Sequence, residues 1–473
     1  MSAGRKRGLW GTRFGFYLAA IGSAFGLGNL WRFPYVTVEN GGGAFVLLYV
    51  LFAICIGLPL LIGELMLGKL SRKSVVQASL SLDEGDGKSF ASLAPLPRSK
   101  TSWAWIGRFS AFACLLILAY YAVISGWVLH FLMQFFFGHL MSGSYDAENS
   151  LRVLRENGWL QILLASVHLL LSLIVVAKGV QEGMEKWVSN AMPVFVVLLI
   201  VLVTKSLSLQ TAPDALRFLF YPDFTKLTPF SMLHALGHVF FTLSIGIGTM
   251  VTFGSYLNEQ THLPSAGFRV TSIDTLISLF AGLLIFPLLA GATPKNVGPE
   301  LLFQTLPGLL QSLDNGFLFG MAFFICLYLA ALGASIGLLE SVVANVLDMT
   351  GLSRAKATWL TGGAAFLFAI IPALSTSSFR RVKIHGYGLL DILDTVLING
   401  ILPLAALGLA LAVASKLKPA SMEAEFVNDD SIATRKMYKH WCFVMRWAAP
   451  TTIMLAFLLA GWGIVRTFLF SGI

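Results

Sequence analysis

Glycines and polar residues interrupt an apolar stretch near the start of the chain. The stretch from Trp10 to Tyr35 is long enough to cross a bilayer, but residues 22–29 read GSAFGLGN and Arg32 follows. Because glycine in a helix interior costs about 1 kcal/mol relative to alanine, we expect the helix to open over 22–28. Inside a membrane such an opening is tolerated only where the freed backbone groups are buried in protein or line a wet cavity. The pattern therefore predicts a binding site at mid-depth of a membrane helix.

A second apolar stretch, residues 229–257, is interrupted in the same way by Ser244, Gly246, Gly248 and Gly254. Corresponding interruptions in two halves of a chain point to the binding site of an inverted-repeat transporter. The alternative is close helix packing through small residues, which explains many glycines in membrane helices. Because the interruptions fall in the first and the sixth of the predicted spans, we favour the transporter interpretation.

The composition is that of an all-α integral membrane protein. Of the 473 residues 56% are hydrophobic and 12% are charged, whereas soluble domains carry about 25% charged residues. We predict about eleven spans of about 20 apolar residues or more. They cover about 12–36, 42–68, 103–137, 159–177, 185–204, 229–257, 266–292, 315–348, 357–373, 387–415 and 443–470.

The distribution of basic residues predicts the orientation. Segments 69–102 and 416–440 are polar, basic loops, and placing both in the cytoplasm explains the net charge of +9 without a nucleic-acid partner. We therefore expect a plasma (inner) membrane protein with a cytoplasmic N-terminus, no cleavable signal peptide and a C-terminus outside. Arg380, Arg381 and Lys383 then lie outside, against the rule.

Enzyme motifs are absent from the sequence. The run from Gly63 to Lys69 imitates the start of a phosphate-binding loop, but Leu70 follows where Ser or Thr would bind Mg²⁺. The chain contains no zinc-protease or serine-hydrolase motif, and Cys55, Cys114, Cys326 and Cys442 form no C-x-x-C pair. We do not expect an enzyme, and we expect the thiols to be buried in apolar surroundings.

Five motifs carry a resemblance to a known family. They are GSAFGLGNLWRFPY at 22–35, NGGGAF at 40–45, Gly57-Leu58-Pro59 with Glu64, the pair Tyr120-Tyr121, and FFTLS at 240–244. The chain resembles the neurotransmitter:sodium symporters, particularly the bacterial amino-acid transporters with the leucine-transporter fold. The resemblance implies a single transporter domain over 1–473, without the last span of twelve-helix relatives. Repeat one is expected at about 10–204, repeat two at about 229–415 and an extra helix at about 443–470.

The resemblance also implies the substrate site. Monoamine carriers of the family have an aspartate where this chain has Ala24, so the substrate should bring its own carboxylate. Amides near Leu27 and Gly28 and the Tyr121 hydroxyl would bind that carboxylate, and backbone carbonyls at both breaks would bind the ammonium group. The apolar slot favours a neutral, hydrophobic amino acid. The substrate residues are Ser23, Ala24, Leu27, Gly28, Ile117, Tyr121, Phe241, Thr242, Ser244, Ile247, Ala334 and Leu338.

At least one sodium ion is implied as well. The first sodium site corresponds to the Ala24 carbonyl, Asn29, Thr242 and Asp274, all oxygen ligands. Asp274 replaces the usual asparagine, so we infer that it supplies the negative charge for which many relatives need chloride, and that chloride is not required here. Ser278 stands where bacterial relatives often place that charge on a glutamate. His238, usually glutamine, should lie within reach of Asp274, which leaves proton coupling through this pair as an alternative.

The second sodium site of the family fits this chain poorly. Carbonyls of Gly22, Phe25 and Ala330 are present, but Gly333 and Ala334 stand where two hydroxyl ligands are expected. A serine follows one residue later, rotated by about 100° around the helix. We therefore predict a missing or weakened second site. This defect keeps one rival open, an amino-acid-binding membrane sensor on the same fold that does not transport.

Two ion pairs are predicted as gates. Arg32 should pair with Asp391 at the outer face, and Arg7 should pair with Asp348 at the inner face. The alternative for each is a static surface pair worth about 0–1 kcal/mol. Glu64 should accept hydrogen bonds from the unwound part of the sixth span. The residues leave the oligomeric state and the particular amino acid open.

Overall fold

The computed structural model describes residues 8–24, 26–82, 103–138, 147–289, 301–384, 387–427 and 432–470. In these ranges the protein is helical except for loops and one short hairpin, in which β1 (Lys383–Ile384) pairs antiparallel with β2 (Tyr387–Gly388). Arg7 and Phe25, which the sequence placed at a gate and at the second sodium site, lie outside the described residues.

Nine helices among the described residues are long and apolar enough to cross a membrane. Their positions confirm nine of the predicted spans, most of them to within a few residues. They are α3–η2–α4 (Gly43–Phe52, Ala53–Gly57, Leu58–Ser71), α6 (Trp103–Phe136), α8 (Gly158–Ala177), η5–α9 (Val180–Glu185, Lys186–Leu207), α13 (Leu263–Leu289), α15 (Gly316–Thr350), α16 (Arg354–Ser375), α17–η8–α18 (Leu389–Thr395, Val396–Ile401, Leu402–Lys416) and α20–η9–α21 (Ile432–Phe443, Val444–Ala448, Ala449–Phe470).

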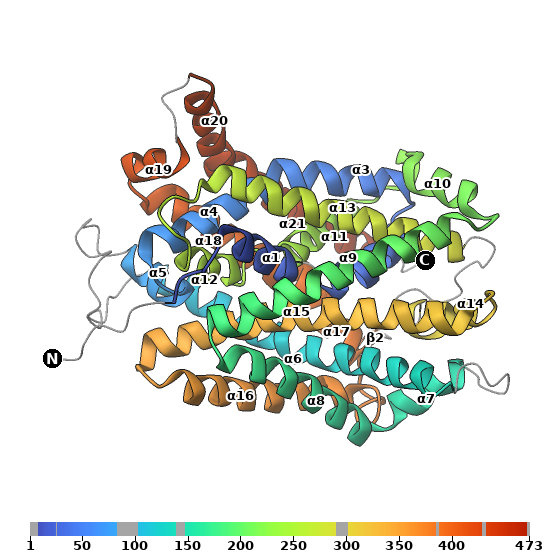
Figure 1. Ribbon diagram of the computed structural model, residues 1–473. Coiled ribbons are helices and arrows are strands. Elements are labelled where there is room, and N and C mark those ends of the chain that lie inside the picture. The colour runs from blue at the N-terminus through green and yellow to red at the C-terminus, as the bar shows by residue number, and fades with distance from the viewer. Residues whose placement is uncertain are drawn as a thin grey trace.

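Shorter helices connect the spans at their ends (Figure 1). They are α5 (Val75–Ser81), α7 (Ala147–Glu156), α10 (Ala212–Phe220), η6 (Phe224–Lys226), η7 (Leu301–Thr305), α14 (Leu306–Gln311) and α19 (Pro419–Phe426). We expected a loop over 416–440, but the structure has α19 and much of α20 there. The expectation was wrong because a basic, polar surface helix lacks the apolar run that identifies a span.

Two spans are interrupted where the glycines predicted it. α1 (Arg13–Ala24) and the continuous pair η1 (Gly28–Arg32) and α2 (Phe33–Glu39) are bent by 44° at their break. α11 (Pro229–Thr242) and α12 (Thr249–Ser255) are separated by residues 243–248, where Gly246 and Gly248 have φ of +89° and +75°. Glycine adopts this left-handed backbone without steric cost. Counting α1 with η1 and α2 as one span raises the number among the described residues from nine to ten, so the total of about eleven stays a prediction.

Backbone contact fixes α12 against α4. A Cβ atom built on Gly68 would lie 1.9 Å from the carbonyl oxygen of Val251, and one on Gly254 would lie 2.4 Å from that of Leu65. Only glycine permits such an approach at both positions, so the short helix α12 packs closely against the second half of α4.

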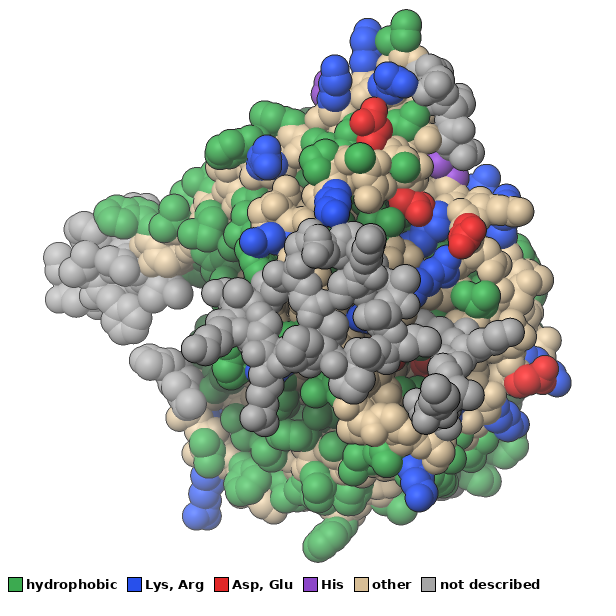
Figure 2. Space-filling model, turned by 90° about the vertical axis from the view of Figure 1, so that its left-hand side faces the viewer, with side chains coloured by type: hydrophobic (Ala, Val, Ile, Leu, Met, Phe, Trp, Pro, Cys, Tyr) green, Lys and Arg blue, Asp and Glu red, His purple; other side chains and the backbone are tan. Residues whose placement is uncertain are grey.

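The connections divide between two ends of the bundle. α5, α19 and α20 lie at one end, and α7, α10 and α14 lie at the other (Figure 1). Basic side chains gather on the face at the first end (Figure 2). The exposed lysines of the connections there are Lys356, Lys416, Lys418, Lys436 and Lys439. The segments predicted to be cytoplasmic therefore share one end of the molecule.

Candidate functional site

The two interruptions face each other across a buried cavity that α6 and α15 complete. The space between protein atoms there is about 310 Å³. Its lining comprises Ser23, Ala24, Gly26, Gly28, Ile117, Tyr121, Phe241, Thr242, Ser244, Ile247, Ala334 and Leu338. The structure thus brings together every residue that the sequence assigned to substrate except Leu27, and it adds Gly26.

Gly26 and Leu27 both contact the tyrosine of α6. The Leu27 amide donates a hydrogen bond of 2.6 Å to the Tyr121 hydroxyl, and a Cβ on Gly26 would lie 2.5 Å from the same oxygen. Sequence reasoning missed Gly26 because its role is close approach rather than a side-chain contact. The Tyr121 hydroxyl keeps its own proton available for a further acceptor, as its predicted role with a carboxylate requires.

The unwound backbone of the second interruption has specific partners. Glu64, buried on α4, accepts a hydrogen bond of 2.7 Å from the Gly246 amide, which confirms the predicted contact. The Ser244 hydroxyl donates to the Ser23 carbonyl at 3.4 Å and so joins the two interruptions. Buried backbone groups need such partners because unpaired ones are costly in a medium without water.

The predicted first sodium site is a compact polar cluster. The Asn29 amide donates to the Asp274 carboxylate at 2.7 Å, to the Asp274 carbonyl at 3.3 Å and to the Ser278 hydroxyl at 2.9 Å. The Thr242 side chain also interacts with the Asp274 carboxylate, and all these residues are buried. Ala24 lines the adjoining cavity. The oxygens of this set are ligands of the kind that a hard cation prefers.

His238 lies beside this cluster without a direct bond to it. Its ring packs against those of Phe33 and Tyr49, with centroids 5.6 and 5.1 Å away. Neither ring nitrogen has a hydrogen-bond partner among the described residues. The Tyr49 hydroxyl, 3.0 Å from the Ser278 hydroxyl, lies between the imidazole and the cluster. No hydrogen bond therefore joins His238 to Asp274 among the described residues, so the expected contact between them is not formed.

At the predicted second sodium site, helix packing takes the place of ligands. A Cβ on Gly333 would lie 2.8 Å from the carbonyl oxygen of Gly22, so α15 and α1 are nearly in backbone contact. The Ser335 hydroxyl, the first one after the two missing hydroxyls, is 2.7 Å from Nε2 of His168 on α8. Ala330 is buried one turn earlier on α15. No side-chain oxygen of Gly333 or Ala334 is available there.

The outer ion pair differs from the predicted one. Arg32, 1% exposed, lies 3.7 Å from the carboxylate of Asp394 and donates to the Asn399 amide oxygen at 3.2 Å. Asp391 instead accepts a hydrogen bond of 3.2 Å from the Gly388 amide at the start of α17. The predicted Arg32–Asp391 pair is therefore corrected to Arg32–Asp394. Residues three apart share a helix face, so the sequence alone does not choose between these two carboxylates.

At the inner end, Asp348 contacts α5. Its carboxylate accepts a hydrogen bond of 2.7 Å from the Ser74 amide, and the Asn345 side chain accepts one of 3.0 Å from the Val76 amide. These two residues thus cap the first turn of α5. The predicted partner of Asp348, Arg7, lies outside the described residues, so that gate stays a prediction.

A buried carboxylate at the same end was missed. Glu340, fully buried on α15, accepts a hydrogen bond of 2.6 Å from the Tyr256 hydroxyl and pairs with Arg354 at the start of α16. The signal that could have identified it is an acidic residue within an apolar helix, which is a functional candidate by default.

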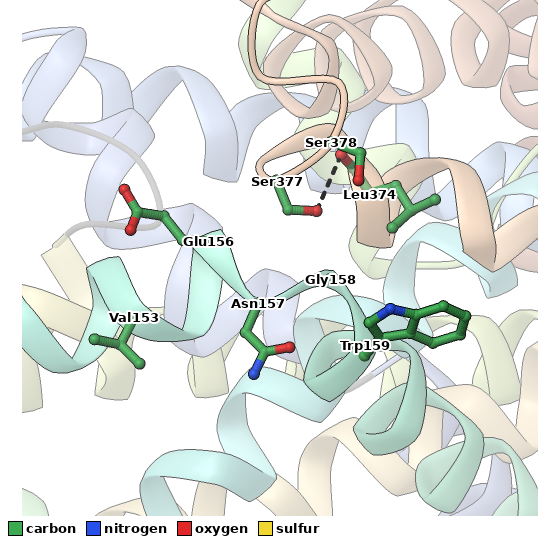
Figure 3. Close-up of a pocket in the computed structure, with 8 residues that line it drawn as sticks. All are labelled: Val153, Glu156, Asn157, Gly158, Trp159, Leu374, Ser377 and Ser378. Atoms are coloured by element: carbon green, nitrogen blue, oxygen red, sulfur yellow. Dashed lines mark hydrogen bonds between the residues drawn. The ribbon is translucent and has the colours of Figure 1, made fainter.

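A second hollow lies on the surface where α7 meets α8, near the end of α16 (Figure 3). Trp159 at its edge is 83% exposed. The side chains of Val153, Asn157 and Ser377 point in different directions rather than toward a common centre (Figure 3). Polar groups converge on the buried cavity instead, so we place the functional site there.

Comparison with known proteins decides the family. The profile of the sodium:neurotransmitter symporter family matches residues 7–150 and 144–462, almost the whole chain. The chain belongs to this family. The symporter is therefore a sodium-dependent membrane transporter rather than an enzyme, as the motifs predicted.

Individual relatives are similar along their whole length. The symporter is 35% identical to the uncharacterized sodium-dependent transporter YhdH of Bacillus subtilis, over 95% of this chain and 96% of that protein. It is 32% identical to an uncharacterized sodium-dependent transporter of Haemophilus influenzae, over 96% and 98% of the two chains. Among solved structures, MhsT in complex with L-phenylalanine matches with a TM-score of 0.86 and 35% identity, over 96% of this chain and all of that one. The leucine-transporter fold is thereby confirmed.

Proposed function

We propose that the protein imports a neutral, hydrophobic amino acid across the plasma membrane by sodium symport. The observation that carries this proposal is the lining of the buried cavity. It combines residues of both interruptions and Tyr121 with the apolar side chains of Ile117, Ile247 and Leu338. This arrangement suits an ammonium and a carboxylate held next to an apolar side chain.

The absence of charged side chains from this lining supports the substrate class. Ala24 supplies no carboxylate, so a substrate must carry its own to balance its ammonium group. A charged substrate side chain would lose its hydration without gaining a partner in the cavity. MhsT, with the same fold and 35% identity, has been solved with L-phenylalanine, which supports an amino-acid substrate here.

We assign one sodium ion to the cluster of Asn29, Thr242, Asp274 and the Ala24 carbonyl. Asp274 balances the ion's charge within the buried site, so chloride is not required. Proton coupling through Asp274 and His238 is the weaker candidate, because the imidazole makes no hydrogen bond to the carboxylate.

Alternating access in this proposal rests on two inverted repeats, about 10–204 and 229–415, that move around the cavity. The N-terminus is cytoplasmic and the C-terminus is outside. The basic side chains at the end that carries α5 and α19 support this orientation (Figure 2).

Uptake into proteoliposomes tests the proposal. The sodium gradient and the pH gradient are imposed separately, and accumulation of radiolabelled neutral amino acids is measured. We expect accumulation with inward sodium, none with a pH gradient alone, and a sodium titration with a Hill coefficient near one. Binding without accumulation under any gradient would favour the rival function, a non-transporting sensor. Accumulation driven by pH alone would favour proton coupling.

A further inference from the structure

Three polar side chains form a cluster below the apolar part of the cavity, which we call the polar floor. It consists of Cys114 on α6, Thr249 on α12 and Ser341 on α15. Each lies within about one helical turn of a lining residue, displaced toward the end of the bundle that carries α5. The corresponding lining residues are Ile117, Ile247 and Leu338.

The polar floor is fully buried and incompletely hydrogen bonded. All three side chains have 0% relative exposure. The thiol of Cys114 donates to the Leu338 carbonyl at 3.4 Å, and the hydroxyls of Thr249 and Ser341 interact with its sulfur. Sulfur is a weak acceptor, and neither hydroxyl has a hydrogen-bond partner of ordinary length among the described residues.

Such hydroxyls need an explanation, because the large majority of buried side-chain polar atoms in proteins have a hydrogen-bond partner. Helices α6, α12 and α15 contribute one polar group each, and these groups converge from three directions. Cys114 contacts the carbonyl of Leu338, which lines the cavity, so a substrate side chain that extended past Ile117 and Leu338 would reach this cluster.

We propose that the polar floor binds a hydrogen-bonding group at the far end of the substrate side chain. The carried amino acid is then aromatic with a polar tip, a phenol hydroxyl or an indole N–H, rather than aliphatic or phenyl. This inference rests on the proposed function and narrows its substrate class. A site built to hydrogen-bond such a group discriminates strongly against the analogue that lacks it, because its own polar groups are then left unpaired.

The test compares L-tyrosine with L-phenylalanine, which differ by one hydroxyl group. Binding of each to the purified full-length protein is measured by titration calorimetry in sodium-containing buffer, with L-tryptophan and L-leucine as further ligands. We expect tyrosine to bind at least about tenfold more tightly than phenylalanine, and tryptophan more tightly than leucine. Equal affinities for tyrosine and phenylalanine would overturn the inference without any variant.

Two variants locate the effect. In Ser341→Ala and Thr249→Val, the ratio of tyrosine affinity to phenylalanine affinity should fall toward one. Phenylalanine affinity should be retained, which also shows that the variants are folded. Ser125→Ala is the matched control, since Ser125 on α6 is equally buried and lacks a partner among the described residues but lies on the opposite side of Ile117 from Cys114 along the helix. Equal weakening of both ligands by the floor variants would indicate a structural role only. Failure of every neutral amino acid to bind would instead contradict the proposed function.

Discussion

The two ion sites predicted beside the interruption in α1 have developed in opposite ways. At the first, Asn29 and Asp274 are joined by a hydrogen bond of 2.7 Å within a buried polar cluster. At the second, a Cβ on Gly333 would lie 2.8 Å from the Gly22 carbonyl, and no side-chain oxygen comes from Gly333 or Ala334. The predicted first site is thus a cluster of polar side chains, whereas the predicted second site is a close packing of two helix backbones.

This difference has a consequence for coupling. An ion that bridges two helices makes their association depend on its concentration. Glycine packing between α1 and α15 holds them together at any sodium concentration. We therefore expect sodium to act through the Asp274 cluster alone and not through the contact between α1 and α15.

The largest effect is expected for Asp274→Asn. Partners of metal ligands already contribute about 10–100-fold to affinity, so loss of the charged ligand should weaken sodium-dependent substrate binding at least about 100-fold. The variant should recover part of this loss in chloride, which can then supply the missing charge. Scintillation proximity binding over sodium and chloride titrations measures both effects. If the sodium dependence of binding were unchanged, Asp274 would not be a ligand of the first sodium site.

The outer ion pair provides a comparison away from both ion sites. Asp394→Asn leaves Arg32 buried without its carboxylate. The loss in free energy of unfolding should be somewhat smaller than for a fully buried pair, for which it is about 3–5 kcal/mol. Asp391→Asn, three residues away, should cost less, because the Arg32 guanidinium pairs with Asp394 and not with Asp391. Transport rates and thermal unfolding measure the two variants, and the sodium titration midpoint should stay unchanged in both. A larger effect at Asp391 would reinstate the pair predicted from sequence.

The closed second site is tested by Gly333→Ala. The added methyl group meets a backbone oxygen, so we expect destabilisation of about 1–3 kcal/mol, seen as a lower unfolding temperature in detergent. Gly363→Ala on α16 is the matched control, because nothing lies within 4 Å of a Cβ built there. If both variants unfolded at the wild-type temperature, the helices could not be in the close contact described.

The smallest effect is expected for Ser335→Ala. Its hydroxyl is bonded to His168 on the neighbouring helix rather than directed to an ion. We expect less than about 1.5 kcal/mol of lost stability from this neutral hydrogen bond and no shift in the sodium titration. A clear rise in the sodium concentration needed for half-maximal binding would show that Ser335 is a ligand and that the second site is intact.

Sequence reasoning located the elements and the cavity because both leave strong local signals. Apolar runs identify spans, and glycines at 22–28 and 246–248 identify the interruptions. Cavity residues such as Tyr121 and Ala24 followed from motifs of the family. Thus the spans away from the interruptions and nearly the whole lining were predictable.

Contacts between separate helices could not be predicted from the sequence, because they depend on which helix faces meet after folding. Asp391 and Asp394 are equivalent in sequence, and only the folded structure distinguishes them, because Arg32 of η1 lies 3.7 Å from Asp394 and the Tyr120 hydroxyl of α6 donates to it at 3.0 Å. The polar floor could not be predicted for the same reason, since its three residues come from separate helices. The helices α19 and α20 were missed because no apolar periodicity identified them.

The backbone contact between α4 and α12 also predicts how amide protons behave. A helix of only seven residues, as α12 is, is marginal in isolation and would exchange its amide hydrogens quickly. Because Gly68 lies against Val251 and Gly254 lies against Leu65, we expect the amides of α12 to open only when α4 moves aside. In hydrogen–deuterium exchange, this short segment should therefore be protected as strongly as the long helix beside it.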